Sequence, residues 1–85
     1  MKIRTFGLCA ALSLTSFVTF VDYSSAIKDL NNSEYTQAFT EFKKLAQQGH
    51  SDAMFELAKM YEQGLGTDES VYDAFSWYML AIDFG

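Results

Sequence analysis

From Ile27 to Gly85, apolar residues recur every three or four positions, which is the period of an α-helix. The first such stretch, Glu34–Gln48, places its apolar residues on one stripe with polar residues opposite, and this predicts a one-sided amphipathic helix. The stripe consists of Tyr35, Ala38, Phe39, Phe42, Leu45 and Ala46. Asn32 or Ser33 is the expected N-cap, and Gly49 is expected just past the C-terminus, where a left-handed backbone suits glycine.

A second helix is expected from Ser51, with Ser51 or Asp52 as its cap. It should end at Gly64-Leu65-Gly66, where two glycines permit a sharp reversal. Its predicted inner face consists of Ala53, Met54, Leu57, Ala58, Met60 and Tyr61.

The third predicted helix covers residues 71–84 and follows the capping candidates Thr67, Asp68 and Ser70. Its apolar residues occupy more than half of the circumference, which is typical of a helix buried on two sides. We therefore expect it to pack against the second helix and against something beyond it. These residues are Val71, Ala74, Phe75, Trp77, Tyr78, Ala81, Ile82 and Phe84.

The first 26 residues have the three parts of a secretory signal peptide. Lys2 and Arg4 give a positive start, residues 6–21 are mostly apolar, and Ser24 and Ala26 are small residues at positions −3 and −1 of a cleavage site. We predict a signal peptide over residues 1–26, cleaved after Ala26, and a periplasmic or secreted product. The alternative is an uncleaved inner-membrane signal anchor, although the apolar run is shorter than the roughly 20 residues that a spanning helix needs. Cys9 lies inside the apolar run, too early to begin a mature lipoprotein.

Composition narrows the partners and the chemistry. The net charge of −5 disfavours nucleic acid, whose binding needs clustered Lys and Arg, and disfavours anionic lipid, so neither nucleic acid nor a membrane is expected as a partner after cleavage. Residues 27–85 contain no cysteine, so their stability must come from packing and not from disulfides.

No set of residues resembles a catalytic or metal centre. His50 is the single histidine, and its neighbours Ser51 and Asp52 would point in different directions at a helix start. We interpret His50 as a solvated residue in a turn between helices. We expect no enzyme activity, no cofactor and no metal.

An internal repeat emerges when the chain is shifted by 36 positions. Gly49 then meets Gly85, Ala38 meets Ala74, Phe39 meets Phe75 and Phe42 meets Tyr78. The first helix is thus equivalent to the third, which predicts a half repeat over residues 33–49 and a full repeat over residues 50–85. A fixed period of this size, with two helices in each unit, is typical of an α-solenoid.

The spacing of these residues resembles the Sel-one-like repeat (SLR), a relative of the tetratricopeptide repeat (TPR). The matching positions are Ala38, Gly49, Ala53, Leu57, Tyr61, Gly64, Gly66, Ala74, Trp77, Tyr78, Ala81 and Gly85. Three positions depart from the pattern: Ala58 replaces a glycine, Thr67 a valine and Ser70 an aspartate. The fold expected over residues 27–85 is all-α: a short α-solenoid of about one and a half SLR/TPR-like repeats, with three antiparallel helices.

The resemblance implies a protein-protein interaction module or adaptor, here in the bacterial envelope or outside the cell. In a solenoid the first helix of each repeat lines the concave surface, so the candidate contact residues are Phe55, Glu56, Lys59, Glu62 and Gln63. Self-association through the apolar end of the third helix, at Met79, Ile82 and Phe84, is a further expectation. Two alternatives stay open: a truncated remnant of a longer repeat protein without independent activity, and a cell-wall accessory or small-ligand binder.

Overall fold

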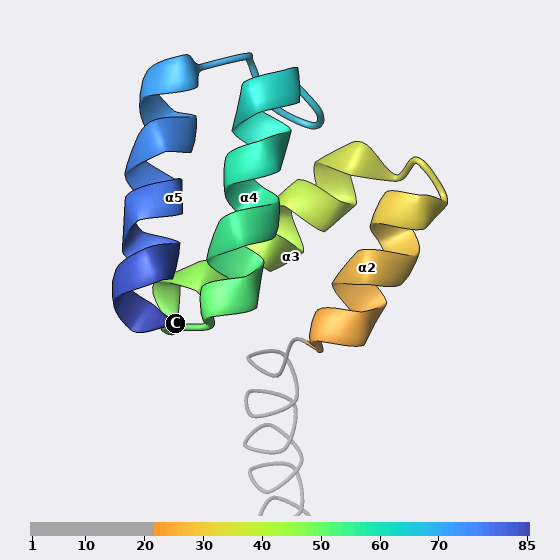
Figure 1. Cartoon of the computed structure of the whole chain (residues 1–85). Helices are drawn as coiled ribbons and strands as arrows, with labels where there is room; N and C mark the ends of the chain where they lie inside the picture. Colours follow the sequence, from red (N-terminus) through yellow and green to blue (C-terminus); the bar gives the residue numbers. More distant parts are fainter. Residues whose placement is uncertain (1–21) are drawn as a thin grey trace, which may run out of the picture.

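The computed structural model describes residues 22–85, and this part of the chain is compact and all-helical (Figure 1). It contains four helices: α2 (Tyr23–Asn31), α3 (Tyr35–Gln47), α4 (Ser51–Gln63) and α5 (Val71–Phe84). The predicted positive start and apolar run of the signal peptide, with Cys9, lie outside the described residues. None of the four described helices is long and apolar enough to cross a membrane.

Each helix packs against the next one along the chain, so α3 contacts α2 and α4, and α4 contacts α3 and α5. Figure 1 shows α4 beside α5 with α3 behind it, and α2 at the far end of the row. The buried residues are apolar and include most of the predicted stripes of α3 and α4, whereas Tyr35, Phe39 and Tyr61 of those stripes are half-buried at the edge of the core. The buried residues are Ala26, Ala38, Phe42, Leu45, Ala46, Ala53, Met54, Leu57, Ala58, Met60 and Ala74.

The helix α2 was not expected from the sequence. It begins at Tyr23, upstream of the predicted domain boundary at Ile27, and it buries Ala26 completely. Tyr23 packs edge-on against the ring of Phe42, with 5.8 Å between the ring centroids. The residues predicted to form the exit of the signal peptide are therefore helical and packed on α3.

The presence of α2 explains an error in the predicted start of α3. The expected caps Asn32 and Ser33 belong instead to the three-residue connection from α2, in which Ser33 adopts a left-handed backbone with φ of 64°. The N-cap is Glu34, whose side chain makes no capping bond. Such a short reversal leaves no extended residue with a hydroxyl in position to accept from the first turn.

The C-terminus of α3 confirms the prediction for Gly49. Gly49 has φ of 93°, and its N–H donates to the carbonyl of Ala46 at 3.0 Å. The next N–H, of His50, donates to the carbonyl of Leu45 at 3.1 Å. These two bonds form a Schellman motif, which satisfies carbonyls that the helix end would otherwise leave unpaired.

The start of α4 corrects two predictions. His50, and not Ser51 or Asp52, is the N-cap, and its Nδ1 accepts a hydrogen bond from the Ala53 N–H at 3.2 Å. The imidazole also stacks on the ring of Tyr23 at 4.8 Å between centroids. His50 is therefore a half-buried structural residue that joins α2 to α4, and its interpretation as a solvated turn residue is wrong.

The loop from α4 to α5 turns at Gly64 and Gly66, as the sequence predicts, and both have positive φ. Gly66 lies directly against the carbonyl of Tyr35 at the start of α3, so that a Cβ there would collide with it. The loop thereby fixes the end of α4 on α3.

The last helix, α5, is capped by the hydroxyl of Ser70, which accepts from the Asp73 N–H at 3.2 Å. One face packs on α4, with Ala74 buried and Trp77 and Ala81 against the core. The predicted neighbour beyond α5 is not found among the described residues, and large apolar side chains on that side are exposed.

Candidate partner-binding surface

The α4 outer face consists of the five residues predicted to contact a partner: Phe55, Glu56, Lys59, Glu62 and Gln63. They follow from the helical period, because the opposite side of α4 carries the buried residues Ala53, Leu57 and Met60. Phe55 is 48% exposed, which is unusual for a phenylalanine in the middle of a well-packed helix.

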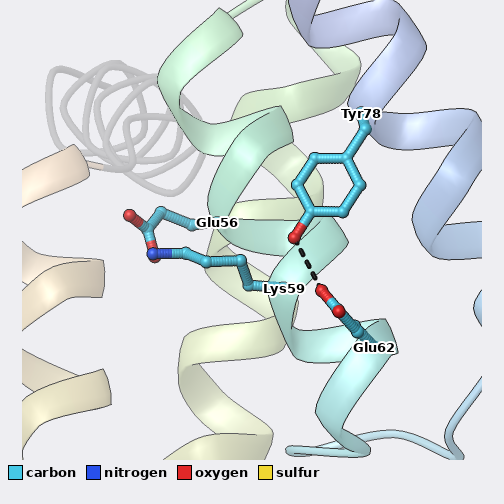
Figure 2. A network of polar contacts seen from close by, with 4 residues as sticks. All are labelled: Glu56, Lys59, Glu62 and Tyr78. Atoms are coloured by element: carbon cyan, nitrogen blue, oxygen red, sulfur yellow. Dashed lines mark hydrogen bonds and ion pairs between the residues drawn. The ribbon is translucent and has the colours of Figure 1, made fainter.

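Lys59 connects the polar and aromatic parts of this face. Its Nζ lies 3.2 Å from Glu56 Oε1, one turn earlier, and 5.2 Å from the centroid of the Phe55 ring. The ammonium therefore combines a short-range ion pair with a cation–π contact. Figure 2 shows Lys59 directed along the helix towards Glu56. Both contacts restrict the side chains around Phe55, which nevertheless stays exposed.

Tyr78 of α5 completes the surface. Its hydroxyl donates a hydrogen bond of 2.8 Å to Oε1 of Glu62, across the gap between the two helices (Figure 2). Its ring packs edge-on against Phe55 at 5.3 Å between centroids. The sequence placed Tyr78 only among the apolar residues of the third helix and at a repeat-matching position, because the contact with Glu62 depends on how α4 and α5 are aligned.

The environment of Tyr78 holds its phenol in the protonated form. Burial raises the pKa of Tyr78 to about 12, and the hydrogen bond to the Glu62 carboxylate and the charges of Glu62 and Glu56 contribute in the same direction. The phenol therefore keeps the proton that it donates to Glu62 throughout the neutral pH range.

Two grooves flank the α4 outer face. The groove towards α5 has a volume of about 390 Å³ and is mostly apolar, and the groove towards α2 and α3 has a volume of about 250 Å³. The first is lined by Ser51, Asp52, Phe55, Tyr78, Ala81, Ile82 and Gly85. The second is lined by Leu30, Tyr35, Glu56, Lys59, Met60, Gln63 and Leu65. Four of the five predicted contact residues therefore line a groove, and Glu62 is held by Tyr78.

A larger hollow of about 630 Å³ lies along the exposed side of α3. It is lined mainly by polar residues within the range 33–44 and lies open at the surface. Glu41 in this lining has a buried Oε1 without a hydrogen-bond partner. Burial raises the pKa of Glu41, and hydrogen bonding to Asp29 adds to the shift.

The described residues hold no group of three or more His, Asp, Glu or Cys side chains that could bind a metal ion. His50 uses its Nδ1 to cap α4, so this nitrogen is not free to act as a base. Comparisons with protein-family models, curated proteins and solved structures found no match to this chain. The function proposed below therefore rests on the arrangement of residues 22–85.

Proposed function

We propose that the chain is an exported SLR/TPR-like interaction module, and that the α4 outer face together with Tyr78 binds a segment of another protein. The observation that carries the proposal is the exposed ring of Phe55, which packs against the half-buried ring of Tyr78 between two grooves. Aromatic side chains held rigidly at the centre of a surface are typical anchors of protein interfaces.

The repeat assignment is part of this proposal, and α2 supports it. In α2 the residues facing the core are Tyr23, Ala26, Ile27 and Leu30, with the spacing i, i+3, i+4 and i+7. The same spacing relates the inner residues of α4, which are Met54, Leu57, Ala58 and Tyr61. We infer that α2 and α3 form one antiparallel repeat and α4 and α5 a second, so that α2 supplies the helix that the half repeat lacked.

The chemistry of the surface indicates the kind of segment that it binds. The apolar groove beside Phe55 suits one apolar or aromatic side chain. Asp52 lines this groove, and Glu62 accepts a hydrogen bond from Tyr78 of the same lining. Lys59 is already paired with Glu56, so the surface carries excess negative charge. A partner segment with an apolar anchor next to Lys or Arg is complementary to both features.

The proposed location is the periplasm or the cell exterior, supported by the signal-peptide pattern of residues 1–26. Fractionation of the producing cells and mass spectrometry of the recovered protein test this directly. Export with cleavage gives a product beginning at Ile27, whereas a product beginning at Met1 in the membrane fraction contradicts cleavage.

The binding surface is tested by placing a photo-crosslinking phenylalanine analogue at Phe55 in the producing cell. We expect a discrete adduct with another protein, because the exposed ring sits at the centre of the proposed contact. The matched control carries the analogue at Thr40, which is exposed on α3 and outside both grooves, and should give no such adduct.

Substitution then shows whether Phe55 contributes to binding. Phe55→Ala should weaken the recovered complex by at least about tenfold, the typical effect of removing a central aromatic anchor. Helicity should not change, since Phe55 is outside the core. Equal adducts at residues 55 and 40, or none at all, would contradict the proposal and favour a remnant without independent activity.

A further inference from the structure

The exposed side of α5 carries a regular apolar seam, defined here as Tyr72, Phe75, Met79 and Ile82. The four residues are separated by three, four and three positions, which is the spacing of the a and d positions in a coiled-coil heptad. All four are exposed, Tyr72 at 81% and Ile82 at 72%. Val71 lies beside the seam and is also exposed. We infer that this seam binds the same seam of a second copy of the chain and forms a two-fold dimer.

A missing repeat does not account for the seam. In the 36-residue shift, α3 is the equivalent of α5, and α3 is already covered by the helix that follows it, α4. Phe39 and Ala46 of α3 correspond to Phe75 and Ile82 of α5. At the positions of Tyr72 and Met79, however, α3 has the exposed residues Thr36 and Lys43. Covering by a following α4-like helix therefore does not require apolar side chains at Tyr72 and Met79. Their presence completes the heptad spacing and indicates a helix packed along the seam.

A second copy is the occupant that the geometry favours, because an a/d seam is complementary to itself under two-fold symmetry. From their exposed fractions, the seam and Val71 present roughly 600 Å² of accessible surface per copy. Two copies together reach about 1,200 Å², the lower end of the range for specific protein interfaces. α5 is already held in helical form by α4, so dimerisation does not have to fold it.

The two copies of α5 should run antiparallel. In a parallel pair the two negative C-terminal ends, each with Asp83 next to the seam, would lie together. In an antiparallel pair Asp83 lies near the N-terminal end of the partner helix, where the helix dipole favours negative charge and offsets the charge of Asp73 in that first turn.

The seam differs from the apolar end expected from the sequence, which consisted of Met79, Ile82 and Phe84. Phe84 is on another side of α5, with its ring 3.5 Å from the position of a Cβ on Gly49, so it is not a seam residue. The seam contains no residue of the α4 outer face and shares only Ile82 with the groove beside Phe55. The dimer does not depend on the function proposed above.

The test is the oligomeric state of the protein as recovered from producing cells, measured by sedimentation and light scattering over a range of concentrations. We expect twice the mass of one chain at high concentration. Met79→Lys should give a monomer with unchanged helicity, because α3 carries Lys43 at the equivalent position. The matched control is Leu80→Lys, next to the seam residue but outside the seam, which reproduces Lys44 of α3 and should leave the dimer intact.

A monomer at every soluble concentration, or equal loss of the dimer in the Met79→Lys and Leu80→Lys variants, overturns the inference. Loss of partner adducts at Phe55 with the dimer retained would reject only the proposed function.

The orientation is tested in a Cys9→Ser background with one chain carrying Tyr72→Cys and another carrying Ile82→Cys. After mixing and treatment with a short thiol crosslinker, an antiparallel dimer gives products that join the two different chains. Products joining only identical chains overturn the antiparallel arrangement.

Discussion

At the scale of single residues, the carboxyl group of Glu41 lies in an unfavourable environment. Its Oε1 is buried without a partner, and Asp29 of α2 lies near enough for the two carboxyl groups to hydrogen-bond once one of them is protonated. Burial raises the pKa of Glu41, so the folded chain holds this proton more tightly than the unfolded chain does. Glu41 therefore favours folding when it is protonated, and this contribution is lost as the pH rises through its raised pKa.

The substitution Glu41→Gln tests this linkage. A neutral amide can donate to Asp29 and needs no counter-charge, so we expect the variant to unfold at a higher temperature than the original chain at neutral pH. The difference should shrink as the pH falls and the carboxyl of Glu41 gains its proton. Thermal unfolding followed by circular dichroism at several pH values measures this. A constant difference across the acid range would show that Glu41 is not the group responsible.

At the scale of elements, the loop between α4 and α5 has one position that admits no side chain. Gly64 and Gly66 both have positive φ, but the space around them differs. A Cβ on Gly64 would have no neighbour closer than 3.4 Å, whereas one on Gly66 would collide with the Tyr35 carbonyl. A side chain at Gly64 would therefore introduce backbone strain alone, whereas a side chain at Gly66 would also clash with α3.

Alanine at each position measures the two effects. Gly64→Ala should reduce the free energy of unfolding by about 1–2 kcal/mol, the usual cost of a left-handed backbone for a non-glycine residue. Gly66→Ala should cost about 1–3 kcal/mol more, because the loop or α3 must move. Urea unfolding of both variants gives the comparison. Equal losses would mean that the contact between the loop and α3 yields easily.

The helices differ in how far the sequence predicts them. The boundaries of α3 and α5 were predicted within one residue, because strong amphipathic periods and glycine or serine ends mark them. The exposure of Phe55 followed from the same period. α2 was missed because Ser24 and Ala26 fit a cleavage site as well as a helix packed through a small residue. The roles of His50 and Tyr78 depend on contacts between helices, which no local pattern contains.

At the scale of the whole molecule, α2 is tied to the rest of the fold by aromatic contacts. Tyr23 packs on Phe42 of α3 and stacks on His50 at the start of α4. The buried Ala26 lies one turn further along α2. These contacts of Tyr23 and Ala26 hold the N-terminal helix of the described residues against α3 and α4.

A chain beginning at Ile27 should therefore be less stable than a chain beginning at Asp22. The two aromatic contacts of Tyr23 together contribute about 1–3 kcal/mol, and the shorter chain lacks both. Urea unfolding of the two chains measures the difference, and Tyr23→Ala in the longer chain serves as the control that removes the ring alone. Equal stability of all three would show that the start of α2 contributes nothing.

If the chain is exported as proposed, the position of Ala26 affects the order of processing and folding. A peptide bond inside a packed helix is cut only from a locally opened state, at a rate that follows the population of that state when opening is fast. If the bond after Ala26 is the processed one, every molecule that packs α2 on α3 first becomes a poor substrate for the processing protease. Proteolytic processing and folding of this chain would then compete kinetically, and variants that destabilise α2 would be processed faster.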